Sequence, residues 1–275
     1  MTKKGKDPEW KGVTGGGTFG QCFLFVLLHW CSVRAGYFFV ALVSPFYLIF
    51  NGKGRKTIYR YFRLQHRFSP LKSLQMSVKN HYRFGQIIMD RFSILAQGKT
   101  RFNVEIDGQS CFDRLINSEK GFVMVSAHVG NFEIGGYLMH QDKKPVNAVV
   151  FAGETVNLQQ NRNKQFGCRN VRLIPVMPDM SHLFLINSAL NNGEIVCMPC
   201  DRLFGSSKNV RCRLLNGEID LPIGAFQLAA IHNVEVITLF VMKEVGMRYR
   251  LYVKSLNCQL INEFSTPPPH RAQKG

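Results

Sequence analysis

The stretch Phe122-Val-Met-Val-Ser-Ala-His-Val-Gly-Asn-Phe-Glu133 decides the fold class and carries the first hint of chemistry. Its first five residues form a nearly continuous apolar run, which is typical of a strand buried on both faces of a parallel sheet. His128 lies two residues past this run, in a turn that contains Gly130 and Asn131. Loops at the carboxyl ends of such strands carry the active sites of α/β folds. The stretch therefore predicts a buried strand that leads into a functional loop.

Strand and helix patterns alternate from residue 100 to residue 255. Apolar or alternating runs predict strands over residues 102–106, 122–126, 146–151, 172–175, 194–199, 211–215, 218–221, 235–241 and 248–253. Helical patterns lie between them, over residues 112–116, 134–140, 157–165, 180–190 and 225–232. This order predicts an α/β domain with a mostly parallel central sheet flanked by helices.

The region before this domain has a different character. Residues 1–17 are polar and basic, and residues 18–50 contain two apolar runs, 22–30 and 35–50. The second run has 16 residues and contains Pro45, which is short of the roughly 20 residues that cross a bilayer. The pattern favours a membrane-associated segment over a removable signal peptide. One tilted, kinked span, a hairpin in one leaflet, and a buried helix pair of a soluble protein all remain open.

Dense basic residues follow the apolar segment: Lys53, Arg55, Lys56, Arg60, Arg63 and Arg67. Such a group favours the cytoplasmic side of a membrane. Helical periodicity continues over residues 51–98, and Ser69-Pro70 is typical of the start of a second helix. We thus expect a basic N-terminus (1–17), an apolar segment (18–50), a helical region (51–98), a catalytic α/β domain (99–258) and a disordered tail (259–275).

The overall charge points to an anionic partner. The 275 residues include 35 Lys and Arg against 18 Asp and Glu, which gives a formal net charge of +17. Nucleic acid, anionic lipid and phosphate-bearing carriers all fit such a charge. The basic clusters are not interleaved with exposed aromatic residues, so nucleic-acid binding is disfavoured. The eight cysteines do not form a disulfide framework pattern in a chain of this length.

His128 and Glu133 are the candidate catalytic pair. A histidine acts as a general base when a partner on one ring nitrogen fixes its tautomer, and a carboxylate one helical turn away can be that partner. Such a base could deprotonate a hydroxyl as it attacks a thioester. The spacing also occurs by chance, so a structural histidine beside an unrelated surface glutamate stays open.

A family resemblance extends this reading. Ser126-Ala-His-Val-Gly-Asn-Phe-Glu-Ile134 resembles the first motif of the lysophospholipid acyltransferase superfamily, and most of all its branch of late lipid A acyltransferases (lauroyl or myristoyl transferase-like). Further resemblance lies in Asn80–Gly85 with Asp90-Arg91, in Asn191–Val196 with Asp201-Arg202, and in Leu215–Glu218 with Leu221–Ala225. Relatives usually continue with a Trp-containing segment where this chain has a Pro-rich tail.

The resemblance implies an acyltransferase of a glycerol-phosphate acyltransferase-like fold, in which His128 is the general base and Glu133 orients it. It places Arg162 near the phosphate or headgroup of the acceptor and Asp201 beside the active site. Lesser candidates for substrate contact are Arg202 and Asn131. The acyl donor would be an acyl carrier protein or coenzyme A thioester, used as a co-substrate, and no cofactor or metal is expected.

The resemblance also implies a setting. We expect a monomer at the bacterial inner membrane, with the catalytic domain facing the cytoplasm and with membrane lipids, acyl carrier protein and the lipid acceptor as partners. The acceptor could be a lipid A precursor, an amino-acid lipid or another lysolipid.

Other functions are weaker alternatives. One is a membrane-bound basic scaffold in which His128 is structural. Another is a hydrolase of ester lipids, against which the absence of a G-x-S-x-G pattern counts. Cys197-Met-Pro-Cys200 could suggest a redox or zinc site, but Cys197 ends an apolar strand and no helix follows directly, so buried structural cysteines are favoured.

Overall fold

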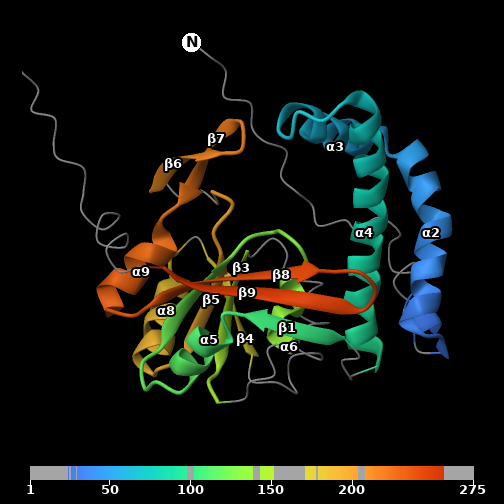
Figure 1. The fold of residues 1–275 in the computed structure, drawn as a ribbon. Helices are drawn as coiled ribbons and strands as arrows, with labels where there is room; N and C mark the ends of the chain where they lie inside the picture. Colours follow the sequence, from blue (N-terminus) through green and yellow to red (C-terminus); the bar gives the residue numbers. More distant parts are fainter. Residues whose placement is uncertain are drawn as a thin grey trace, which may run out of the picture.

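The computed structural model describes residues 24, 26–28, 30–97, 102–138, 143–151, 171–177, 179–203 and 208–256. In Figure 1, a twisted sheet with helices on both faces stands beside two long helices that run next to each other. These are α2 (Val33–Phe50) and α4 (Pro70–Gln97), and the shorter α3 (Gly52–Leu64) connects them at one end. The predicted helical region and its second start at Pro70 are confirmed.

The central sheet has seven strands in the order β1-β9-β8-β2-β5-β3-β4. Their bounds are β1 (Asn103–Asp107), β2 (Phe122–Ser126), β3 (Val146–Phe151), β4 (Val171–Val176), β5 (Ile195–Pro199), β8 (Val236–Lys243) and β9 (Arg248–Leu256). Neighbours from β8 to β4 pair in parallel, whereas β9 runs antiparallel to β8 and parallel to β1. The predicted mostly parallel sheet is therefore confirmed.

Helices cover both faces of the sheet. On one face the core includes Phe122 and Met124 of β2, packed with α5 (Gln109–Ile116) and α6 (Gly135–Leu138). On the other face, Val123 and Val125 pack with α8 (His182–Asn191) and α9 (Gly224–His232). Successive residues of a strand point to opposite faces. Burial on both faces explains why the β2 sequence is apolar throughout instead of alternating.

A two-stranded hairpin, β6 (Asn209–Leu214) and β7 (Gly217–Pro222), lies apart from the main sheet. Leu214 pairs with Gly217, so the turn residues are Leu215 and Asn216, one position earlier than the predicted Asn216-Gly217. Asn216 donates a hydrogen bond of 2.5 Å to the carbonyl oxygen of Gln65. The hairpin tip therefore rests against the end of α3, as Figure 1 shows.

The helix predicted over residues 134–140 begins earlier. A short 3-10 helix, η1 (Phe132–Ile134), precedes α6. The chain turns early because the backbone N–H of Asn131 donates to the carbonyl oxygen of Val241 on β8, at 2.8 Å. The helix predicted over residues 157–165 lies outside the described residues.

Helix α2 makes up most of the described part of the predicted apolar segment. It has 18 residues with a mean hydropathy of 1.6, and by length and composition it could cross a membrane. Pro45 lies inside it without ending it. One side of α2 packs on α4, where Gly36 faces Met89 and Gly85 faces Val40. The other side leaves large apolar residues exposed, among them Phe38, Phe46, Ile49 and Phe50.

Candidate active site

His128 and Asp201 meet at the carboxyl edge of the sheet. Strands β2 and β5 are parallel neighbours, and their last residues, Ser126 and Pro199, are register partners. Each site residue follows its strand by two positions. The backbone N–H of Cys200 donates to the carbonyl oxygen of Ser126 at 2.8 Å and continues the pairing beyond the strands. The strand register alone therefore brings the two side chains together.

Two hydrogen bonds join the pair. The Nδ1 atom of His128 lies 2.8 Å from Oδ1 of Asp201, and the backbone N–H of His128 donates to Oδ2 at 3.0 Å. Burial alone would raise the pKa of the Asp201 carboxyl, but the hydrogen bonds from His128 outweigh burial and lower it. An ionised carboxylate only accepts, so the ring proton is on Nδ1. Nε2 of the neutral ring is then the basic nitrogen.

This geometry differs from the sequence analysis, which gave the orienting role to Glu133. Glu133 lies in η1 and forms an ion pair with Arg91 of α4. Phe132 separates the two motif residues along the chain, and its ring packs edge-on against the His128 ring, with 4.9 Å between centroids. Asp201 therefore lies at Nδ1 of His128, and Glu133 anchors the loop to α4.

The loop between His128 and Glu133 requires a glycine. Gly130 has a φ of 67°, in the left-handed region. A Cβ atom added there would lie 2.1 Å from the carbonyl oxygen of Val241. Gly130 and Val241 form an isolated parallel bridge. The loop therefore lies directly against β8, and only glycine fits both the backbone conformation and the space.

Asn131, a lesser candidate for substrate contact, points into the protein. Its side chain is buried, and its Nδ2 atom donates to the hydroxyl of Tyr249 at 2.9 Å. The turn at Gly130 directs this amide inward, between α4 and β9. Asn131 therefore connects the loop to β9.

Two further residues, Arg202 and Arg162, were predicted to contact the substrate. Arg202 follows Asp201 and is exposed at the same edge of the sheet, where its side chain can reach solvent. Arg162 lies outside the described residues.

Cys197 and Cys200 lie next to the site, at the end of β5, and both are free thiols. Burial raises the pKa of the Cys197 thiol to about 11. Burial and the nearby Cys197 and Asp201 raise the pKa of the Cys200 thiol to about 12. These thiols stay protonated near neutral pH, which agrees with the structural role favoured by the sequence. Within the described ranges, His, Cys, Asp and Glu form no group of three or more placed to hold a metal ion.

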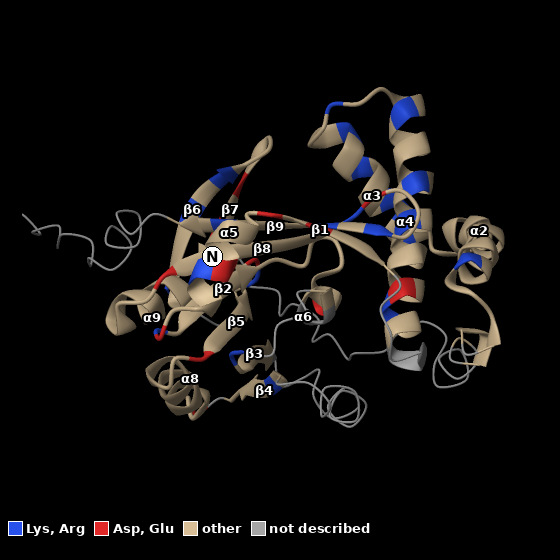
Figure 2. Ribbon diagram, turned by 60° about the horizontal axis from the view of Figure 1, so that its bottom comes forward, with Lys and Arg blue, Asp and Glu red and all other residues tan. Residues whose placement is uncertain are grey.

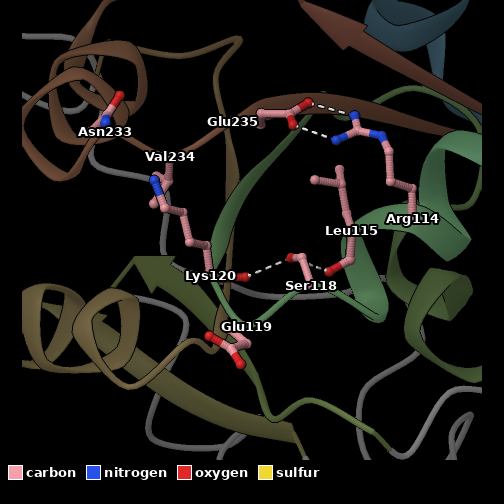
Figure 3. Close-up of a pocket in the computed structure, with 9 residues that line it drawn as sticks. Arg114, Leu115, Ser118, Glu119, Lys120, Asn233, Val234 and Glu235 are labelled. Atoms are coloured by element: carbon pink, nitrogen blue, oxygen red, sulfur yellow. Dashed lines mark hydrogen bonds and ion pairs between the residues drawn. The ribbon is translucent and has the colours of Figure 1, made fainter.

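A hollow of about 340 Å³ lies elsewhere on the sheet, and Figure 3 shows residues that line it. It is lined by residues 118–121, which precede β2, and by residues 233–235, which precede β8. Arg114 and Glu235 are joined across it by two hydrogen bonds of 2.5 and 2.7 Å. The hollow therefore lies at the amino ends of β2 and β8, whereas His128 follows the carboxyl end of β2. Active sites of α/β sheets form at carboxyl ends, so the His128 edge is the candidate site.

Basic residues gather on the helices beside this edge. Figure 2 shows Lys and Arg along α3 and α4. Helix α3 has no acidic residue among Gly52–Leu64, and its basic residues are Lys53, Arg55, Lys56, Arg60 and Arg63. This surface suits an anionic partner.

Two comparisons with known proteins found similar sequences or folds. The sequence model of the family described as bacterial lipid A biosynthesis acyltransferase matches residues 72–263, which include both halves of the His128–Asp201 pair. A solved 1-acyl-sn-glycerophosphate (LPA) acyltransferase from Thermotoga maritima is similar over 89% of this chain and 92% of its own, at 13% identity and a TM-score of 0.37. A search of curated proteins found no match.

Proposed function

The chain belongs to the family of bacterial lipid A biosynthesis acyltransferases, and we propose that it moves a fatty acyl group from a thioester donor onto a membrane lipid, with His128 as the general base. Acyl transfer to a lipid follows from the family. The hydrogen bond between His128 Nδ1 and Asp201 carries the proposal for the base, because it leaves Nε2 free to accept a proton at the carboxyl edge of the sheet.

In the proposed reaction, His128 first accepts a proton from the acceptor group and then donates it to the leaving group. Nε2 of His128 takes the proton of the acceptor hydroxyl or amine as that group attacks the carbonyl carbon of the thioester. The C–S bond then breaks, and the imidazolium returns the proton to the leaving sulfur, so the products are the acylated lipid and a free thiol. Asp201 stabilises the imidazolium in between. Base assistance of this kind increases rates by roughly 10²–10⁴-fold.

The donor is proposed from charge. Acyl carrier proteins are acidic, and the net charge of +17 with the basic helix α3 would attract one. An acyl coenzyme A thioester also carries phosphates and is the alternative donor. Arg202, exposed beside Asp201, is proposed to contact a phosphate of donor or acceptor.

The location is proposed from helix α2. Contiguous exposed apolar side chains mark interaction or membrane surfaces, and those of α2 are followed directly by the basic α3. We place α2 in the bacterial inner membrane, either across it or along one leaflet, with the catalytic domain on the cytoplasmic side.

Acyl transfer is tested with purified protein in vesicles. Acyl carrier protein and coenzyme A thioesters are offered separately, each with a lipid A precursor, an amino-acid lipid and a lysolipid, and products are identified by lipid mass spectrometry. Wild type is expected to acylate one acceptor class. His128→Ala is expected to lose turnover while it stays folded and vesicle-bound. His232→Ala, which changes a histidine held between α8 and α9, is the matched control and should keep activity.

Other outcomes separate the alternatives. Free fatty acid without acylated lipid would identify a hydrolase. No product from any donor and acceptor, together with an unchanged host lipidome on deletion, would support a binding scaffold. Full activity of His128→Ala would refute the proposed base.

A further inference from the structure

A buried polar cluster connects the apolar helix α2 to the catalytic loop. Its centre is Asp90 of α4, which is fully buried and forms an ion pair of 2.6 Å with Lys243 at the end of β8. Tyr37 of α2 donates to Oδ1 of Asp90, and Tyr249 of β9 donates to Oδ2 at 2.5 Å. The carboxylate therefore holds three elements of the fold to α4.

All three hydrogen-bond donors of the Lys243 ammonium have an acceptor. The Nζ atom of Lys243 donates to Asp90, to the hydroxyl of Tyr37 at 2.8 Å and to the carbonyl oxygen of Gly246 at 2.9 Å. An ammonium has three donors, and these contacts use all of them. A buried ion pair contributes little net stability, but a fully paired network selects one arrangement of its elements.

The cluster continues into the loop of the site. The hydroxyl of Tyr249 donates to Asp90 and accepts from Nδ2 of Asn131. The backbone N–H of Asn131 is fixed to Val241 at the same time. Asn131 lies between His128 and Glu133, so three hydrogen bonds lead from α2 to the middle of the catalytic loop.

Helix α4 holds the loop at a second point. Arg91, next to Asp90 in the chain, forms the ion pair with Glu133. One turn of α4 therefore fixes the loop twice, through Asp90 and Tyr249 at Asn131 and directly at Glu133.

Close apolar packing between α2 and α4 accompanies the hydrogen bond from Tyr37 to Asp90. Gly36 and Gly85 let the helices approach, since a Cβ atom at Gly85 would lie 2.5 Å from a methyl carbon of Val40. Apolar contacts are not directional and permit sliding of one helix along another. The hydrogen bond from Tyr37 to Asp90 sets the register of α2 on α4.

We propose that Tyr37, Asp90 and Tyr249 are positioning residues that couple the seating of α2 on α4 to the conformation of the loop that carries His128. The coupling gives the candidate membrane helix an effect on the site: when α2 is seated, Asp90 and Tyr249 are held, and Asn131 keeps the loop against β8. The proposal rests on the proposed function only for the role of His128; the coupling itself can be measured without turnover.

The test uses paired tyrosine variants of the full chain in anionic vesicles. Tyr37→Phe and Tyr249→Phe each remove one cluster hydroxyl and keep the ring. Tyr47→Phe, on the exposed side of α2, and Tyr252→Phe, at an exposed position of β9, are matched controls outside the cluster. Deuterium uptake is followed in peptides that cover residues 127–134, with a peptide over residues 182–196 as the internal reference.

Both cluster variants are expected to exchange the 127–134 amides at least about fivefold faster, while the reference peptide and both controls match wild type. Turnover per folded molecule should fall about tenfold or more in both, with KM for the thioester within about twofold, because misplaced catalytic groups affect the chemical step. A structural role alone would lower Tm without lowering the turnover per folded molecule at an unchanged KM.

Two results would overturn the proposal. Unchanged uptake and turnover in Tyr249→Phe would remove the cluster as a positioning device. A change in Tyr249→Phe without any in Tyr37→Phe would remove the coupling to α2. If wild type transfers no acyl group, the proposed function fails, but the exchange result still decides whether α2 controls the loop.

Discussion

Asp201 accepts two hydrogen bonds from His128, one from the backbone N–H at 3.0 Å and one from ring Nδ1 at 2.8 Å. The residues are 73 positions apart in the chain. One carboxylate thereby fixes both the main chain and the ring of the proposed base. Oδ2 binds the main chain of His128, and Oδ1 binds its ring. We expect a substitution at Asp201 to change the tautomer of the ring more than the fold.

Replacing Asp201 by Asn tests this arrangement first. The neutral amide can no longer stabilise an imidazolium, and it can donate to Nδ1 and so favour the wrong tautomer. We expect kcat for acyl transfer to fall by roughly 10²–10⁴-fold with an unchanged circular dichroism spectrum. Asp107→Asn, at the exposed end of β1, is the control. Retention of more than half of the activity by Asp201→Asn would contradict the assignment.

The Arg91–Glu133 ion pair gives a second prediction. Its side chains are 31% and 25% exposed, so each is partly desolvated and depends on the other. Arg91→Met and Glu133→Gln should each lower kcat by about tenfold, and the double variant should lose little more than either, because residues of one unit are not additive. Glu133 could instead orient His128 independently of Arg91. In that case Glu133→Gln would lower kcat as much as Asp201→Asn does, and the losses from Arg91→Met and Glu133→Gln would add in the double variant.

Much of the fold could be read from local pattern. Apolar runs predicted β2 and β3 with their observed bounds, because a strand that is buried on both faces is apolar over most of its length. The order of strands could not be read, and that order decides the partner of His128. Asp201 meets it only because β5 pairs with β2 in register. The family resemblance placed Asp201 beside the active site, but nothing in the sequence predicted that its carboxylate pairs with His128.

The contacts that Glu133 and Asn131 make could not be read from the sequence either. Both lie within five residues of His128, and a regular helix starting at once would have placed Glu133 near the ring. The loop instead binds to Val241 through Gly130 and Asn131 before η1 begins. Such tertiary hydrogen bonds have no signature within the motif itself, apart from the glycine.

Acid should remove part of the stability that Asp201 provides. Its pKa is lowered in the folded protein, where hydrogen bonds from His128 outweigh burial. A carboxyl with a lowered pKa stabilises the fold above its unfolded pKa of about 3.9 and loses that contribution as the pH falls through the folded value. The Tm difference between wild type and Asp201→Asn should shrink as the pH falls below about 3.9.

Asp90 does not disturb this comparison. Burial raises the pKa of its carboxyl despite the contacts to Lys243, but Asp90 is present in both proteins and its titration cancels in the difference. A Tm difference that stayed constant down to pH 3 would show that the carboxylate of Asp201 is not held by His128.

Cysteine labelling provides a prediction near the site. With pKa values of about 11 and 12, Cys197 and Cys200 are ionised in about one molecule in ten thousand or fewer at pH 7. N-ethylmaleimide at pH 7 should leave both unlabelled in the native protein, while the exposed Cys31 reacts. Peptide mass spectrometry reads the sites, and labelling in urea is the positive control. Rapid native labelling of Cys197 would point to a reactive thiol.

Two positive-φ residues should respond to substitution with opposite signs. At Gly130, an added Cβ would lie 2.1 Å from a backbone oxygen of β8, so Gly130→Ala must move the loop or the strand. We expect a loss of about 2 kcal/mol or more in the free energy of unfolding, and a loss of acyl transfer since the loop carries His128.

Leu215 has a φ of 56° at the hairpin tip, a conformation that favours glycine, and its side chain is 55% exposed. Leu215→Gly relieves backbone strain and removes little buried area, so stability should stay level or rise by up to about 1 kcal/mol. Thermal unfolding in detergent measures both variants, and a change of about 1 kcal/mol moves Tm by roughly 2–4 °C in a chain of this size. The two residues share a backbone region and differ in what surrounds them, so a loss of stability in both would show that Leu215 makes contacts at α3 that outweigh its strain.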